Sequence, residues 1–210
     1  MADNNTLNIA AMDSQFTYEQ RVAVAVLILI IFVLGTMGNG IVILAVILSQ
    51  ELQTITNVFV VSLAVADLCY CLLLPLSNVV ALLSFDGWPW DSEIPCFLSA
   101  LMAFTSAGAS MYNLACIALN RMLLIRGPAV AFHWLFTPKK IVCMVVATWV
   151  IPLAAMLLPL AFGIGQLGYD PTDNTCSDID SHPRYVEYHF VQAFCIYPVP
   201  LITIVVSYSL

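Results

Sequence analysis

The chain has 210 residues, of which 61% are hydrophobic and only 9% are charged. Soluble domains carry about 25% charged residues, so this composition excludes an ordinary soluble protein and indicates a membrane protein. Six Lys and Arg against thirteen Asp and Glu give a net charge of −7. Because no basic surface is available to neutralise phosphates, we expect no nucleic-acid partner, and the apolar content excludes intrinsic disorder.

The first 21 residues form a polar, acidic tail that has no Lys or Arg before Arg21. A secretory signal peptide needs a basic start and a short apolar run, and residues 1–20 have neither. We therefore expect the following apolar stretch to target the chain. Asn4 begins an Asn-Asn-Thr sequon, which predicts glycosylation if the tail is extracellular.

Five long apolar stretches follow, at about residues 22–48, 57–85, 94–125, 141–164 and 189–210. About 20 apolar residues are enough to cross the hydrocarbon core of a bilayer as a helix, and each stretch reaches that length. None alternates apolar and polar residues as a strand of a membrane barrel does. The sequence therefore predicts an all-α membrane protein whose spans satisfy their backbone hydrogen bonds internally.

The distribution of charge predicts the orientation of the spans. The loop between the third and fourth stretches carries Arg121, Arg126, Lys139 and Lys140, as the positive-inside rule expects of a cytosolic loop. The first inner loop, residues 49–56, contains Glu51 and no base, so the prediction rests on the second. With the N-terminus outside, 11 of the 13 acidic residues are extracellular.

Two of the seven cysteines do not lie inside the apolar spans, but at the end of one span and in a loop. Cys96 opens the third stretch at its outer end, and Cys176 lies in the long outer loop, where an oxidising compartment allows a disulfide to persist. A bridge between them would fix the loop over the helices. His133, His182 and His189 are scattered, and we predict loop or interface roles for them and no metal site.

Two charged residues lie where lipid makes them costly. Asp67 is about ten residues into the second stretch, where a carboxylate costs at least about 2.5 kcal/mol. It either joins helices through hydrogen bonds or forms a cation or proton site, with Asn39, Ser106, Ser110 and Asn113 as polar neighbours. Arg121, at the inner end of the third stretch, either extends toward the lipid headgroups or binds a partner chain.

Several motifs resemble those of rhodopsin-like G-protein-coupled receptors, and the match runs from Val22 to the end of the chain. Gly38-Asn39 and Leu63-Ala64-Val65-Ala66-Asp67 are similar to the signatures of the first two spans. Asn120-Arg121-Met122 stands where the family has Asp-Arg-Tyr. Its arginine, Arg121, follows Cys96 by 25 residues. The other matching positions are Pro75, Trp88, Ile125, Pro128, Trp149, Cys176, Pro200 and Tyr208.

The resemblance implies a partial seven-transmembrane helix bundle of the plasma membrane, which binds an extracellular ligand and activates a heterotrimeric G protein. It implies the Cys96–Cys176 disulfide and an allosteric Na⁺ pocket formed by Asp67, Asn39 and Ser110; no other cofactor is expected. It also implies a role in coupling or activation for Asn120, Arg121, Met122, Ile125, Pro128 and Tyr208.

The chain departs from the family pattern in two respects. Asn120 replaces the usual acid beside Arg121, which predicts a weakly held inactive state and raised basal coupling. The chain stops at Leu210, inside the fifth span, so we expect it to be a fragment that lacks the sixth and seventh spans.

The ligand pocket implied by the family is apolar here. Amine receptors place an aspartate seven residues after the third-span cysteine, and this chain has Ala103. Together with Phe104, Ala107 and Gly108, this favours an apolar or neutral ligand. The second-span segment and the loop before Cys176 resemble the melatonin-receptor branch and its orphan relatives, but Ile196 replaces the branch's histidine, so melatonin itself is not the expected ligand. A basic peptide steered by the acidic outer loops is the alternative.

A transporter or channel is the alternative function, in which Asp67 would bind a coupling ion. Transporters usually contain repeated halves, and the sequence shows none. An intramembrane enzyme would need a nucleophile with a base or paired acids, whereas Asp67 is the only deep ionisable group. The chain is therefore not expected to be an enzyme.

Overall fold

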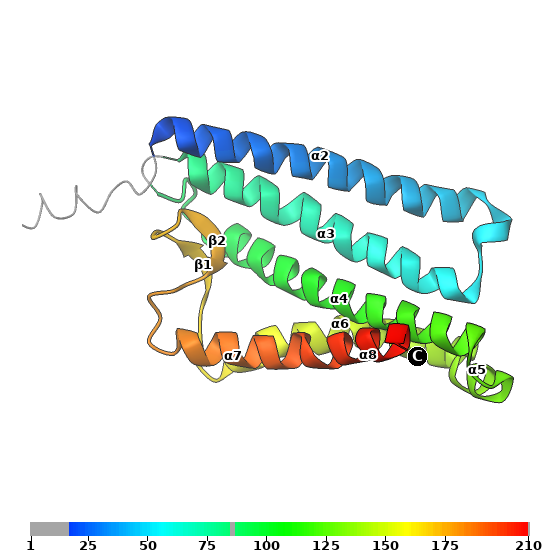
Figure 1. Ribbon diagram of the computed structural model, residues 1–210. Helices are drawn as coiled ribbons and strands as arrows, with labels where there is room; N and C mark the ends of the chain where they lie inside the picture. The colour runs from blue at the N-terminus through cyan, green and yellow to red at the C-terminus, as the bar shows by residue number, and fades with distance from the viewer. Residues whose placement is uncertain (1–16, 85–86, 210) are drawn as a thin grey trace, which may run out of the picture.

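The computed structural model describes residues 17–84 and 87–209, so Asn4 lies outside the described residues. Five helical spans are long and apolar enough to cross a membrane, and α7 and α8 together form the fifth. This confirms the predicted all-α membrane architecture of a partial bundle. The spanning helices are α2 (Tyr18–Leu48), α3 (Ile55–Leu83), α4 (Ile94–Ile125), α6 (Pro138–Ala161), α7 (Tyr185–Ile196) and α8 (Pro198–Ser209) (Figure 1).

The helices begin at capping residues rather than at the first apolar residue. Thr17 forms a capping box with Gln20, so α2 begins four residues before the predicted stretch and includes part of the predicted tail. Thr54 caps α3, and Pro138 occupies the first turn of α6, so both helices also begin earlier than predicted. Helix α4 has the predicted bounds, 94–125.

The fifth span is interrupted at a proline, as its sequence favours. Helix α7 ends at Ile196 and α8 begins at Pro198, which has no N–H to donate to the carbonyl of Phe194. The Leu201 N–H donates to the Tyr197 carbonyl at 3.0 Å and resumes the helical pattern. By contrast, α3 and α6 continue through Pro75, Pro152 and Pro159.

Helix α4 lies at the centre of the bundle and contacts α3, α6, α7 and α8, whereas α2 packs on α3 (Figure 1). Many of its buried residues are small, which allows close approach of neighbouring helices where lipid removes the hydrophobic driving force. A Cβ added to Gly108 would lie 2.6 Å from the Pro152 Cβ, so only glycine lets α6 approach here. The outward surfaces carry exposed apolar side chains such as Leu34 and Ile202, as a lipid-facing bundle requires.

A two-stranded hairpin that the sequence did not predict covers the end of the bundle where α2 and α4 begin, which is called the outer end here after its predicted orientation. Strands β1 (Leu167–Asp170) and β2 (Thr175–Asp178) pair antiparallel, with Tyr169 opposite Cys176. The Cys96–Cys176 disulfide is present, as expected, and the Cys176 N–H donates to Asn78 Oδ1 at 2.8 Å. The hairpin is thus tied to both α3 and α4.

The opposite end, called the inner end, carries two short helical segments that the sequence did not predict, η1 (Gln50–Leu52) and α5 (Ala129–Leu135). Phe136 follows α5 and is buried against Phe59 of α3, with ring centroids 6.3 Å apart in an edge-to-face arrangement. This contact belongs to an apolar cluster with Ile117 and Ile141, which fixes the second inner loop beneath the bundle.

Breaking the disulfide should destabilise the bundle. Cys96 and Cys176 are 80 residues apart, and closing a loop of this length restricts the unfolded chain by a free energy of about 2–5 kcal/mol. We expect Cys176→Ser to lower the thermal unfolding midpoint measured in detergent. Cys143→Ser, which alters an exposed free thiol, is the matched control, and equal midpoints for the two variants would contradict the assigned role.

Candidate functional site

A cavity of about 280 Å³ opens at the inner end of the bundle, between the ends of α4 and α8. Arg121, Met122 and Ile125 reach it from α4, and Tyr208 reaches it from α8. The structure thus brings together four of the six residues predicted to act in coupling. The Arg121 side chain makes no ion pair or hydrogen bond with any described residue, so its guanidinium is available to a partner. Pro128 lies outside this lining and caps α5 instead.

Asn120 faces away from this cavity. It is fully buried, and its Oδ1 accepts a hydrogen bond of 2.8 Å from the Thr56 hydroxyl near the start of α3. Its Nδ2 has no hydrogen-bond partner among the described residues. Asn120 therefore joins α4 to α3, and the position beside Arg121 carries an amide without charge.

The deep carboxylate of Asp67 has one polar neighbour that the sequence proposed. Ser110 Oγ donates to Asp67 Oδ1 at 2.6 Å, linking α4 to α3 in the middle of the bundle. Asn39 does not join this pair, because its Nδ2 donates to the Gly35 carbonyl of its own helix at 3.0 Å. Asn113 and Ser106 are buried on α4, and Asn113 Oδ1 and Ser106 Oγ have no partner among the described residues. The interior of the bundle therefore contains polar atoms that could form further hydrogen bonds.

A second cavity, of about 170 Å³, lies toward the outer end between α4 and α7. Phe104, Ala107, Gly108 and Ile196 line it, as the sequence predicted for a ligand pocket. Ala103 is buried and is absent from this lining, so the prediction for that residue is not matched by the cavity. The remaining lining residues are His189, Gln192, Ala193 and Tyr197.

Apart from Ile196, sequence reasoning missed the α7 side of this cavity, although a signal was present. Positions 189, 192 and 193 precede Ile196 by seven, four and three residues, which is the spacing of one helix face. Gln192 is only 6% exposed and supplies an amide to an otherwise apolar wall. The lining is therefore mostly apolar, with a few side chains that can form hydrogen bonds.

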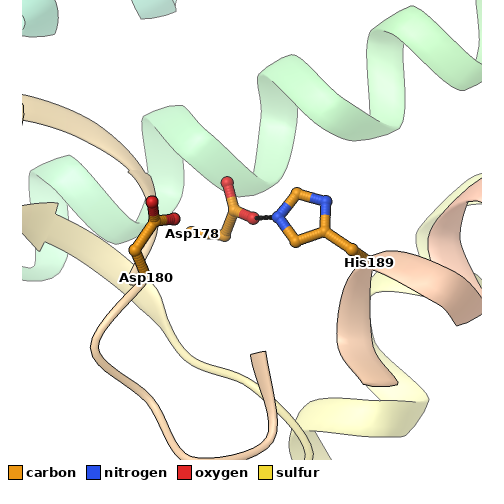
Figure 2. A group of neighbouring side chains, drawn as sticks. All are labelled: Asp178, Asp180 and His189. Carbon is orange, nitrogen blue, oxygen red and sulfur yellow. Dashed lines mark ion pairs between the residues drawn. The ribbon is translucent and has the colours of Figure 1, made fainter. Parts of the chain in front are cut away.

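His189 also contacts an acidic residue outside the pocket. Its Nε2 forms an ion pair with Asp178 Oδ2 when the imidazole is protonated, and Asp180 lies beside Asp178, as Figure 2 shows. Burial raises the pKa of the Asp178 carboxyl, while the charge of His189 acts in the opposite direction. His189, for which the sequence predicted a loop or interface role, thus joins α7 to the hairpin.

Comparison with known proteins finds the same architecture. The sequence model for "7 transmembrane receptor (rhodopsin family)" matches residues 38–210. The melatonin receptor type 1C of Gallus gallus is 31% identical over 73% of this chain and 43% of its own length, and the histamine H2 receptor of Cavia porcellus is 32% identical over 86% and 47%.

The melatonin receptor type 1A of Phodopus sungorus is 30% identical over 88% of this chain and 50% of its own length. The chain therefore spans about half the length of the curated relatives it matches. The crystal structure of squid rhodopsin superposes with a TM-score of 0.81 at 20% identity, covering 93% of this chain and 53% of that one.

Proposed function

The chain belongs to the rhodopsin family of seven-transmembrane receptors, and we propose that it is the first five spans of a receptor that activates a heterotrimeric G protein. The observation that carries the proposal is the inner cavity, where Arg121 lies beside Tyr208 and forms no ion pair or hydrogen bond with the described residues. A planar guanidinium with several N–H donors suits the binding of main-chain carbonyls on a docking peptide. The alternative of a transporter has no comparable support, since the relatives are receptors.

We place the protein in the plasma membrane with its N-terminus outside. Figure 1 shows the start of α2, the hairpin and the start of α7 at one end of the bundle, and α5 at the other. The disulfide lies at the first end, where an extracellular compartment is oxidising. Lys139, Lys140 and Arg126 lie at the second end, as the positive-inside rule requires of the cytosol.

The outer cavity supports a small neutral ligand. Its lining contains no carboxylate among the described residues, so a buried ammonium group would have no counter-charge there. Gln192 and His189 offer hydrogen bonds to a polar substituent, while Phe104 and Ile196 contact an apolar body. Ligand binding then activates the receptor to the extent that it favours one helix arrangement over another.

Removing the Arg121 guanidinium should strongly weaken coupling. We expect Arg121→Ala in the full-length receptor to lower ligand-free nucleotide exchange on a purified heterotrimeric G protein about tenfold or more, equivalent to about 1.4 kcal/mol. Arg184→Ala is the matched control, because Arg184 pairs with Glu187 at the outer end. Undiminished exchange by Arg121→Ala would contradict the proposal, and solute flux without a G protein would favour the transporter.

Restoring the acid beside Arg121 should reduce basal activity. In Asn120→Asp, a carboxylate oxygen can still accept the Thr56 hydroxyl, while the added charge attracts the neighbouring guanidinium and favours the inactive arrangement. We expect lower ligand-free exchange at equal surface expression. Gln50→Glu adds the same charge at the same end of the bundle, at an exposed side chain outside the cavity lining, and should have little effect. An unchanged rate in Asn120→Asp would refute the idea that Asn120 raises basal coupling.

The pair Asp67–Ser110 should make the receptor sensitive to sodium. A cation beside the carboxylate is stabilised in the bundle interior, where unused acceptors such as Asn113 Oδ1 also lie. We expect Na⁺ to lower ligand-free exchange in the parent receptor, Asp67→Asn to remove this effect, and Ser110→Ala to weaken it. Ser99→Ala is the control, because the Ser99 hydroxyl bonds its own helix. Full sodium sensitivity in Asp67→Asn would contradict the sodium site. Asp67 would then serve only to join α3 to α4 through its hydrogen bond with Ser110.

A further inference from the structure

Three potential metal ligands converge at the outer end of the bundle, outside the coupling cavity and the deep carboxylate. Asp178 ends β2, Asp180 follows two residues later, and His189 lies in the second turn of α7. Each offers one ligand atom, and these atoms all lie within 4.8 Å of one another. Figure 2 shows the Asp178 carboxylate between the other two side chains.

Asp178 and His189 face each other at the centre of this cluster. Asp178 is only 7% exposed, and its Oδ2 forms an ion pair with His189 Nε2 when the imidazole is protonated. Neither atom has a further hydrogen-bond partner among the described residues. Because metal ligands bind in their deprotonated forms, a metal ion can take the place of the proton between these two atoms.

We propose that Asp178, Asp180 and His189 form a binding site for a divalent transition-metal ion, of which Zn²⁺ fits best. One imidazole nitrogen with two carboxylate oxygens is a ligand set that suits Zn²⁺, with water in the fourth position. Ca²⁺ and Mg²⁺ prefer oxygen ligands alone, so the histidine selects against them.

The geometry requires a modest rearrangement, in which the facing atoms of Asp178 and His189 move apart and the more distant ligand atoms move closer. Ligand atoms about 2.0–2.2 Å from a tetrahedral Zn²⁺ are roughly 3.4 Å apart, against the present limit of 4.8 Å. The His189 side chain is 42% exposed, which leaves a route for the ion from the extracellular side. Only Asp178 is deeply buried, so the other two ligands can adjust around it.

Groups behind the ligands hold them in place. The Asp180 N–H donates to Asp170 Oδ2 at 3.1 Å. The Tyr185 ring also packs on His189, with centroids 4.3 Å apart. Contacts of this kind behind the ligands orient them and support metal affinity.

A bound ion would connect two parts of the molecule that bear on the outer cavity. Asp178 is two residues from Cys176, whose disulfide fixes the hairpin, while His189 lines the cavity. The ion would fasten α7 to the hairpin and withdraw the imidazole from a ligand. Metal binding does not depend on receptor activity, whereas its effect on a ligand rests on the proposed function.

The test measures Zn²⁺ on the purified full-length receptor, treated with chelator and then titrated with Zn²⁺ against a fluorescent zinc indicator. We expect one ion per chain at micromolar Zn²⁺, and affinity weakened about tenfold or more in His189→Ala and in Asp180→Asn. His182→Ala, in the loop before α7, is the matched control and should bind as the parent does. Replacing Zn²⁺ with Co²⁺ should give the visible absorption of a tetrahedral site.

Several outcomes would overturn the site. These are no stoichiometric Zn²⁺, undiminished binding in His189→Ala, or an equal loss in His182→Ala. Asp180→Asn guards against misfolding, because Asp180 is less buried than Asp178, and thermal midpoints are measured for each variant. Zn²⁺ binding without any nucleotide exchange would refute the proposed function alone, and exchange without Zn²⁺ binding would refute this site alone.

Discussion

The close packing of α4 is the constraint on which the other features depend. Lipid offers no hydrophobic force to drive helices together, so their association relies on van der Waals contact and interhelical hydrogen bonds. Gly108 lets Pro152 of α6 touch the α4 backbone, and Ser110 reaches Asp67 across the interface with α3. Because α4 is held on both sides, its two ends are fixed: Cys96 anchors the hairpin at one end, and Arg121 enters the inner cavity at the other.

The energetic cost of polar atoms in lipid explains which site residues the sequence could reveal. Asp67 and Arg121 stand out because few charges occur in the spans, and motif spacing then identifies their surroundings. Ser110 was predicted on this basis and does contact Asp67, while Asn39 was also predicted and instead bonds its own helix. Depth along a helix can be read from sequence, but the direction of a short polar side chain depends on packing that sequence alone does not specify.

The potential metal ligands that sequence reasoning missed lie in a loop and near the outer end of a span, where a charged residue is common and does not stand out. Asp178, Asp180 and His189 are ordinary residues in a polar loop and at the start of an apolar stretch, so composition does not distinguish them. Their proximity follows from the hairpin, which depends on the pairing of β1 with β2 and on the disulfide. Helix ends were misplaced for a related reason: capping residues such as Thr17 are polar, and hydropathy excludes them from the span they begin.

The interruption at Pro198 separates the outer and inner parts of the fifth span. His189 and Gln192 lie on α7 and face the outer cavity, whereas Tyr208 lies on α8 and faces the inner one. A proline removes a backbone hydrogen bond and lowers the cost of changing the angle between the two segments. An ion or ligand that holds α7 against the hairpin can then alter the inner cavity only if its affinity differs between the two arrangements of this joint. The outer contacts of α7 are therefore where differential binding must arise, and α8 is where its consequence reaches the inner cavity, the proposed G-protein site.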